Sequence, residues 1–549
     1  MPTLPIRGVG DVGVVTDISA AHLPANAFTR GKNIRFDEGA VVRAPVFRRV
    51  ETNTVNKPRF IFSRLSETGH GSIIFVDDKF DIREYAAGNF TNKLTNTPAL
   101  SSFLEPFTGT SLAEAIYINR SDRVPVYVFG SDCASLSSGT NGWQSIWRTK
   151  SIRAYGDFLL ALNMTEGAQQ RPNRVRWSDL ALMSSSSQFA EPTWNAADPT
   201  TSAGFNDIVQ MKTGIVDGAQ LGSNFIIYSK DQIWLMSFVG GTFIFNFRKL
   251  FQDRGLINQN CVVEVNGRHY CFGTDDIYAH DGNTITSIAD QRVKNYVFNG
   301  IASDKLKVCF VHHNPVLEEI YFCYNSQDDL HEFEGGTRCN RAAVYNYKND
   351  TWSFMDMPNV NSATMASLET TLAYNTASTT TYEEIGGTYF SQESEFALHN
   401  IFGGETNPGG GGGPGVISSN RLYALDGSEE NTKVSLPVDT GATIPPFLER
   451  VGIDIDEQVP LAGYKVITKV VPQLHSDNPN KQFNFNFGAS DLITSSTTYE
   501  PTVTFDANVS HKIDTRSAGR YLSYKMTTTD DKDFNFLGFD VDLTMTGRR

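Results

Sequence analysis

Two pairs of adjacent carboxylates and one pair of adjacent histidines are the residues whose types could do chemistry in this chain. Asp77-Asp78 and Asp275-Asp276 lie at expected hairpin turns, and His312-His313 lies at the end of an expected strand. Two carboxylates about 5–10 Å apart in a cleft can hydrolyse a glycosidic bond. At turns, however, Asp is favoured for hydrogen bonds to the local backbone, and neighbouring strand residues face opposite sides of a sheet. We therefore expect local turn contacts from the aspartates and no shared metal ion at the histidines.

Six cysteines are the other candidates for metal or redox chemistry: Cys133, Cys261, Cys271, Cys309, Cys323 and Cys339. None has the C-x-x-C spacing typical of zinc and dithiol sites. Cys261 and Cys271 could face each other across a hairpin, but a cytosolic origin disfavours a disulfide. We interpret all six as free thiols buried in strands. The sequence also lacks G-x-S-x-G, P-loop and H-E-x-x-H motifs, so we predict no enzyme and no catalytic, cofactor-binding or metal-binding residue.

Arginine clusters and tryptophans could instead form binding surfaces. The basic clusters are Arg43 with Arg48-Arg49, residues 171–176, and Arg548-Arg549. They could anchor the chain on an acidic partner or on phosphate, but strand-edge charge that discourages sheet-to-sheet aggregation is the favoured interpretation. Trp177, Trp194 and Trp234 could form a sugar platform, although packing between sheets is the more common use.

The elements that must position these residues are predicted to be short antiparallel strands. The pattern Tyr-Ala-x-Asp-Gly occurs at residues 278–282 and again at 423–427. It indicates a strand followed by a two-residue hairpin turn, in which Gly accepts the positive φ. Looser versions recur with about four strands per 40–50 residues, the period of a β-propeller blade, and the two copies lie about three such units apart. A set of stacked sandwiches is the alternative.

The chain is therefore predicted to be mainly β, with four regions. Residues 1–57 form a platform segment with a helical turn near 24–28 and a hairpin at Glu38-Gly39. Residues 58–360 hold five or six propeller blades, and residues 361–446 form a loop-rich insertion with one further blade. That insertion contains a glycine-rich loop at residues 407–415.

From residue 447 to residue 549 we expect a C-terminal β-sandwich or platform. Its last strand, residues 539–545, alternates apolar and polar residues. Helical periodicity is confined to short stretches near residues 111–115 and 289–298.

Charge and composition limit the partners. The chain has 549 residues, of which 40% are hydrophobic, and a net charge of −14. An acidic chain is a poor candidate for reading DNA sequence, but an acidic surface lets DNA pass without adhering. No charged segment followed by an apolar one opens the chain, and no apolar run approaches the ~20 residues that span a bilayer. We expect a soluble protein without a signal peptide or a transmembrane segment.

Several motifs, in their shared order, are similar to those of tail proteins from short-tailed bacteriophages. At the N-terminus they are Leu23-Pro-Ala-Asn-Ala-Phe-Thr, Asn33-Ile-Arg-Phe-Asp-Glu-Gly and Arg43-Ala-Pro. In the middle they are Asn224-Phe-Ile-Ile-Tyr-Ser-Lys-Asp-Gln-Ile-Trp-Leu-Met, Asp253-Arg-Gly-Leu and His269-Tyr-Cys-Phe-Gly-Thr-Asp-Asp-Ile-Tyr. The last is Phe539-Asp-Val-Asp-Leu-Thr-Met-Thr-Gly-Arg-Arg. The chain thus resembles the tail nozzle family, also called tail tubular protein B or tail hub, with its related packaged-DNA stabilisation proteins.

The resemblance implies a structural virion protein located in the phage tail and assembled in the bacterial cytoplasm. It implies a homohexamer around an axial channel, below an adaptor ring that contacts the platform, with the insertion as nozzle tip or fibre dock. Tail fibres or spikes and double-stranded DNA, which the ring retains and then conducts during ejection, are the further partners. The alternatives are a propeller glycosidase or lyase acting on envelope polysaccharide, and a glycan-binding receptor-recognition protein.

Overall fold

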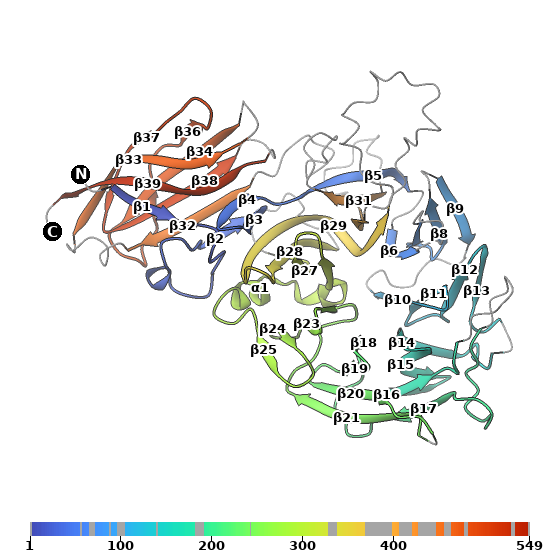
Figure 1. The fold of residues 1–549 in the computed structure, drawn as a ribbon. Coiled ribbons are helices and arrows are strands. Elements are labelled where there is room, and N and C mark those ends of the chain that lie inside the picture. Colours follow the sequence, from blue (N-terminus) through green and yellow to red (C-terminus); the bar gives the residue numbers. More distant parts are fainter. Residues whose placement is uncertain are drawn as a thin grey trace, which may run out of the picture.

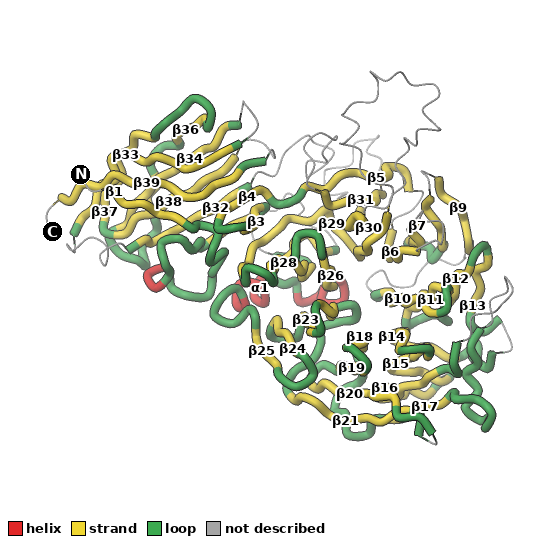
Figure 2. The backbone as a smooth tube through the Cα atoms, in the orientation of Figure 1, coloured by secondary structure: helices red, strands yellow, loops and turns green. Residues whose placement is uncertain are grey.

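A computed structural model describes most of the chain, and everything below concerns those residues. They are residues 3–54, 58–64, 72–86, 89–95, 105–138, 141–181, 191–241, 243–327, 338–367, 398–405, 420–426, 446–454, 463–476, 481–528 and 533–546. They form a β-propeller and a β-sandwich that lie side by side (Figure 1). Strands predominate throughout, and the helical segments are short (Figure 2).

Five four-stranded antiparallel sheets follow one another around the propeller axis, and each pairs its strands in chain order (Figure 1). The first two comprise β6 (Pro58–Arg64), β7 (Ser72–Asp77), β8 (Ile82–Ala86), β9 (Asn89–Leu94), and β10 (Phe107–Leu112), β11 (Ala115–Arg120), β12 (Val126–Phe129), β13 (Asp132–Ser135). The third comprises β14 (Trp147–Tyr155), β15 (Phe158–Glu166), β16 (Gln169–Trp177) and β17 (Gly204–Asp207). The last two comprise β18 (Asp217–Leu221), β19 (Asn224–Tyr228), β20 (Gln232–Phe238), β21 (Phe245–Gln252), and β22 (Val262–Val265), β23 (Arg268–Phe272), β24 (Ile277–His280), β25 (Ile285–Ser287).

A seven-stranded sheet supplies two more blades. Its strands are β26 (Phe310–Asn314), β27 (Glu319–Tyr324), β28 (Cys339–Asn346), β29 (Thr351–Ser367), β30 (Leu398–Glu405), β31 (Asn420–Asp426) and β5 (Val46–Thr54). The long strand β29 changes partner near Val360, where the register with β30 shifts. Its first half completes the sixth blade and its second half is the innermost strand of the seventh. The described residues therefore form a seven-bladed propeller, which agrees with the expected five or six blades followed by one more.

The ring closes through a strand that precedes the first blade. β5 pairs antiparallel with β31, with Phe47 opposite Leu425. Residues 46–54 thus belong to the propeller, whereas the sequence analysis assigned them to the platform. The expected boundary at residue 360 likewise falls inside β29. The reason is that a strand that precedes the first blade in sequence becomes the outermost strand of the last blade and so covers its open edge. Local sequence cannot reveal a pairing between segments this far apart.

Hydroxyl groups connect neighbouring innermost strands at two blade boundaries. Between the seventh and first blades, Ile61 and Ser63 donate their N–H groups to the hydroxyls of Ser362 (3.0 Å) and Thr364 (3.2 Å). Between the second and third blades, Ile152 and Ala154 donate theirs to the hydroxyls of Thr108 (3.2 Å) and Thr110 (3.0 Å). In both cases, donors two residues apart meet acceptors two residues apart, because alternate strand residues face the same side. The hydroxyls satisfy backbone donors that an innermost strand cannot pair within its own blade.

The sandwich combines both ends of the chain in two six-stranded sheets. One sheet contains β1 (Thr3–Arg7), β3 (Ile34–Asp37), β4 (Ala40–Arg43), β33 (Tyr464–His475), β37 (Ile513–Gly519) and β39 (Asn535–Thr546). The other contains β2 (Arg30–Lys32), β32 (Phe447–Ile453), β34 (Gln482–Ser490), β35 (Thr498–Tyr499), β36 (Val503–Asp506) and β38 (Tyr521–Thr528). The alternation predicted for residues 539–545 is seen in β39, where Phe539, Val541 and Leu543 are buried. The predicted C-terminal sandwich is therefore completed by the N-terminal strands.

Backbone and side-chain bonds fix the sandwich against the sixth blade. Asn33 donates its N–H to the carbonyl of Phe354 (2.8 Å), and its side-chain oxygen accepts the N–H of Asp356 (2.9 Å). Arg35 forms an ion pair with buried Glu319 (2.9 Å). Burial raises the pKa of Glu319, so the nearby guanidinium is needed to keep this carboxylate charged. These contacts join residues more than 280 positions apart in sequence.

Some local expectations differ from the structure. Residues 111–115, expected to be helical, form the β10–β11 hairpin, whose turn residues Ala113 and Glu114 have positive φ. The helix expected near 289–298 is α1 (Lys294–Gly300), and the short 3₁₀ segments are η1 (Ala20–His22), slightly before the turn expected at 24–28, and η2 (Ser303–Val308). The Glu38-Gly39 hairpin is confirmed.

The repeated Tyr-Ala-x-Asp-Gly pattern occupies the third strand of two blades. Tyr278 lies in β24 and Tyr423 in β31, and both are buried. The blades concerned are two apart rather than three, because long insertions separate the strands of the later blades. After β24 the turn spans four residues, not two, since His280 pairs with Ile285. Gly427 and the glycine-rich residues 407–415 lie outside the described residues.

We expect Phe47→Ala to destabilise the propeller by opening its closure. Phe47 is 1% exposed and packs edge-on against Phe402 (5.4 Å) and Tyr423 (6.2 Å). Truncation of a buried Phe costs about 3–5 kcal/mol, which differential scanning calorimetry will record as a lower Tm. The control is Phe243→Ala, at a position that is 78% exposed. Equal Tm values for the two variants would show that β5 is not needed for closure.

Candidate functional site

The propeller axis contains a cavity of about 430 Å³. The innermost strands of all seven blades line it, namely β6, β10, β14, β18, β22, β26 and the second half of β29. Its wall is polar and apolar in about equal parts, with hydroxyls, amides and Arg153 among aromatic and aliphatic side chains. Many of the polar groups are already bonded within the wall, including Thr110, Ser362 and Thr364.

A buried ion pair lies against this cavity and connects four blades. Arg153 contacts Asp217 through two bonds, of 2.9 Å at Nε and 2.6 Å at Nη2. Ser151 and the N–H of Asn260 donate to the same carboxylate, at 2.5 and 2.8 Å, and Arg153 also donates to the carbonyl of Gly109 (2.9 Å). Although burial opposes ionisation, these donors hold the pKa of Asp217 below its usual value. The pair is satisfied internally and serves as a structural joint.

A second, much smaller cavity of about 30 Å³ lies beside the first, between Phe60, Phe107, Arg120 and their neighbours. The Phe107 ring stacks on Phe60 (6.0 Å) and Phe80 (5.8 Å), and Arg120 lies over it at 5.4 Å. Four residues line both cavities, namely Phe60, Asn260, Phe310 and Asn361.

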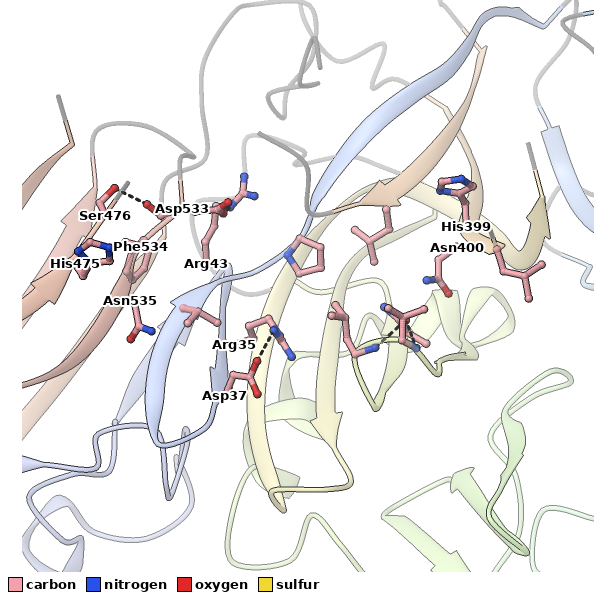
Figure 3. A pocket seen from close by; sticks show the side chains of 17 residues that line it. Arg35, Asp37, Arg43, His399, Asn400, His475, Ser476, Asp533, Phe534 and Asn535 are labelled. Carbon is pink, nitrogen blue, oxygen red and sulfur yellow. Dashed lines mark hydrogen bonds and ion pairs between the residues drawn. The ribbon is translucent and has the colours of Figure 1, made fainter. Parts of the chain in front are cut away.

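A larger cleft, of about 760 Å³, lies where the sandwich meets the propeller (Figure 3). We call it the junction cleft. Its apolar lining comes from Val42, Pro45, Val316, Leu317, Leu398, Leu425 and Phe534. Its polar residues include Arg35 with Asp37 (3.0 Å) and Arg43 with Asp533 (2.5 Å). In both pairs the arginine is the more buried partner, so carboxylates are the charges that reach solvent.

A directed hydrogen-bond chain joins the fourth and fifth blades. The Tyr228 hydroxyl lies 2.6 Å from His269 Nδ1 and 2.6 Å from His280 Nε2. His269 Nε2 donates to the carbonyl of Gln220 (2.8 Å), and His280 Nδ1 accepts the N–H of Gly282 (3.2 Å). Both rings are therefore neutral, with Tyr228 donating to His269 and accepting from His280. Burial lowers the pKa of His269 to about 4 and, with His269 nearby, that of His280 to about 3.

Asp77 makes the expected local turn contacts, Asp276 instead contacts the next strand, and the two histidines face opposite sides of their sheet. Asp77 accepts the N–H groups of Lys79 and Asp81, both at 2.9 Å, and Asp276 accepts from Ser287 (2.8 Å). His312 is buried and contacts Asn400 (2.8 Å), whereas His313 faces the other side and contacts Tyr347 (3.2 Å). No group of three His, Cys, Asp or Glu side chains in the described ranges could hold a metal ion.

The tryptophans and most of the described arginines from the candidate binding surfaces are engaged inside the molecule, whereas Arg171 is exposed. Trp177, Trp194 and Trp234 are all buried, so they pack between sheets and offer no sugar platform. Arg174 and Arg176 share Glu166, at 2.9 and 3.0 Å. The side chains of Arg48-Arg49 and residues 548–549 lie outside the described set. All six cysteines are free thiols, and only Cys133 is not fully buried.

Sequence reasoning missed both buried networks as functional units. Arg153, Asp217 and Tyr228 carry no local signal, because their partners lie on other blades. One indication existed, since Tyr228 and His269 lie within two of the resemblance motifs. No helix among the described residues is long and apolar enough to cross a membrane.

No protein-family profile matches the chain, and no curated protein matches it. Among solved structures, it is similar to the WD40 β-propeller domain of Doa1, with 11% identity and a TM-score of 0.33, over 69% of this chain and 96% of that one. It is also similar to YCF48 bound to D1 peptide, with 8% identity and a TM-score of 0.34, over 71% and 99% of the two chains. The sheet topology itself defines the class: a mainly β protein with a seven-bladed propeller and a β-sandwich.

We expect acid to destabilise the fold through the buried histidines. Folding lowers the pKa of His269 from about 6.5 to about 4. The contribution of neutral His269 to the free energy of unfolding is therefore complete above pH 6.5 and is lost as the pH falls toward 4. The loss for this residue is of the order of 3 kcal/mol. Thermal scans from pH 7 to pH 4 should show a falling Tm, and His269→Gln should flatten that fall.

His511→Gln, at an exposed position, is the matched control and should leave the pH profile unchanged. If His269→Gln retained the full wild-type slope, the buried network would not be the source of the acid sensitivity.

Proposed function

We propose that this chain is a structural virion protein, the tail nozzle or hub of a short-tailed bacteriophage, assembled as a homohexamer. The observation that supports it is where the resemblance motifs lie in the fold. The N-terminal motifs contain Asn33 and Arg35, which join the sandwich to the propeller. They also contain Arg43, which lines the junction cleft together with Arg35. The last motif forms most of β39, which pairs with β1 at the centre of the sandwich.

The middle motifs lie at a joint as well. They contain Tyr228 and His269, whose hydrogen bond connects the fourth blade to the fifth. Motifs that coincide with joints between parts of the fold favour a protein whose activity is its shape. We accordingly propose that the chain acts without catalysis and without a cofactor, as a channel and gate that retains DNA and conducts it during ejection.

The axial cavity bears on how such a channel would be built. The cavity at the propeller axis holds only about 430 Å³, whereas the major groove of duplex DNA alone is about 12 Å wide. DNA would therefore pass between subunits, along the axis of the ring and not of the propeller. A net charge of −14 per chain would disfavour adhesion of DNA to that lumen.

We expect the chain to assemble into a six-fold ring when combined with the head-to-tail adaptor protein of its phage. Mass photometry should give a species with six copies of the 60.7 kDa chain beside the adaptor, and negative-stain images should show six-fold symmetry. The ring would lie in the virion tail, next to fibres or spikes. Monomers that persist in the presence of adaptor would contradict the proposal.

An assay for reducing ends released from host polysaccharide tests the enzymatic alternative in the same samples. Turnover at enzymatic rates would replace the structural proposal with a propeller glycosidase or lyase.

A further inference from the structure

The hairpin between β20 and β21 ends in the most conspicuous exposed apolar group of the propeller rim. Phe238, Val239 and Phe243 are 57%, 56% and 78% exposed, and Gly240-Gly241 separates them. We call these three side chains the aromatic knob. Single exposed hydrophobic residues are normal on a protein surface, but a contiguous group of this size marks an interaction site.

The knob is held in place from below. The Phe238 ring packs against Phe158 (5.9 Å) and Phe245 (6.0 Å). The Tyr155 hydroxyl accepts the N–H of Phe238 (3.1 Å) and donates to the carbonyl of Ser223 (2.7 Å). A rigidly supported aromatic anchor loses little conformational entropy on binding, which is the property of an interface hot spot.

Basic side chains follow the knob along the edge strand. Arg248 and Lys249 of β21 are exposed, and in the described part of the chain no ion pair joins either of them to a carboxylate. The knob therefore presents apolar side chains beside positive charge, on a chain whose net charge is −14. That net charge disfavours an anionic membrane as the partner.

The junction cleft has the complementary properties. It is lined by apolar side chains, and its exposed charges are Asp37 and Asp533, at 40% and 48%, above arginines that are 14% and 3% exposed (Figure 3). Its volume of about 760 Å³ falls within the range of about 300–1,000 Å³ that accommodates drug-sized ligands, so aromatic side chains fit. The cleft and the knob lie on opposite sides of the propeller, since β21 is at the rim away from the sandwich (Figure 1).

We propose that the aromatic knob of one copy of this chain docks in the junction cleft of the next copy. Such a contact is heterologous, because two different surfaces meet, and repeated head-to-tail contacts close into a ring when the rotation allows it. The knob supplies the apolar centre. Arg248 and Lys249 extend from opposite faces of β21, so one of them meets Asp37 and Asp533 at the rim. The inference rests on the proposed ring, and it assigns the two surfaces that hold the ring together.

Two surface variants test the contact. Val239→Ser with Phe243→Ser removes the knob, and Val316→Arg, at a position 70% exposed in the cleft, blocks the cleft and repels the basic edge. Each should raise the concentration needed for half-assembly at least about tenfold, measured by mass photometry with the full chain, alone and with adaptor. Leu492→Ser with Val509→Ser, 63% and 73% exposed on the sandwich, is the matched control and should assemble like wild type.

Mixing the two defective variants identifies the heterologous geometry. Each variant keeps one intact surface, so an equimolar mixture should form dimers of about twice the chain mass and nothing larger. Monomers only in that mixture would overturn the knob-in-cleft pairing. Unchanged Tm values for all variants verify that the substitutions act on assembly and not on folding.

The remaining outcomes separate this inference from the proposed function. If wild type and both variants form the same ring, the knob and cleft are not the contact, while the ring stands. If wild type stays monomeric with adaptor present, the proposed ring fails and the knob-in-cleft contact fails with it.

Discussion

Closure of the propeller by the pairing of β5 with β31 is the constraint on which the rest of the structure depends. β5 is the outermost strand of the seventh blade, and only Ala44 and Pro45 separate it from β4 of the sandwich. The chain also leaves the seventh blade after β31 and resumes as β32 of the sandwich. Both covalent connections between the two bodies therefore start from one blade. The sandwich must lie beside the closure, and the contacts of Asn33 and Arg35 with the sixth blade then fix its orientation.

The innermost strands impose a second constraint, because each has an edge with no β-partner in its own blade. Different blade boundaries satisfy it with different chemistry. Hydroxyls bridge two boundaries, the Arg153–Asp217 pair spans the second to fifth blades, and the Tyr228–histidine chain joins the fourth to the fifth. Charged and polar groups of this kind cost free energy on burial and are tolerated only when every partner is present. This explains why Arg153 bonds to Asp217, and Tyr228 to the two histidines, between blades and not to solvent.

Much of the fold follows from the sequence, whereas little of the site does. Alternation in residues 539–545, the Glu38-Gly39 turn and the repeated pattern around Tyr278 and Tyr423 are local signals that predict strands, a hairpin and blades. The blade spacing inferred from the repeated pattern is wrong by one blade, because it depends on insertions elsewhere. The closure strand could not be found in this way, because Phe47 pairs with Leu425 and neither segment carries a local pattern that indicates the other as its partner. β29 was divided at residue 360 for the same reason: one continuous strand serves two blades, and only its pairing partners distinguish the halves. The junction cleft draws its lining from both ends and the middle of the chain, so no motif could describe it.

The location of the available surfaces bears on what such a molecule can do. Its tryptophans are buried, and Arg43, Arg174 and Arg176 of its arginine clusters pair with carboxylates of the same chain. In the proposed ring, the rim and the junction would form the contacts between subunits. The axial cavity of about 430 Å³ is too small for a duplex, so the proposed conduit would lie between copies. In the proposed ring, the propeller would form part of the channel wall. The contacts between its blades would then determine whether it keeps its shape while DNA passes.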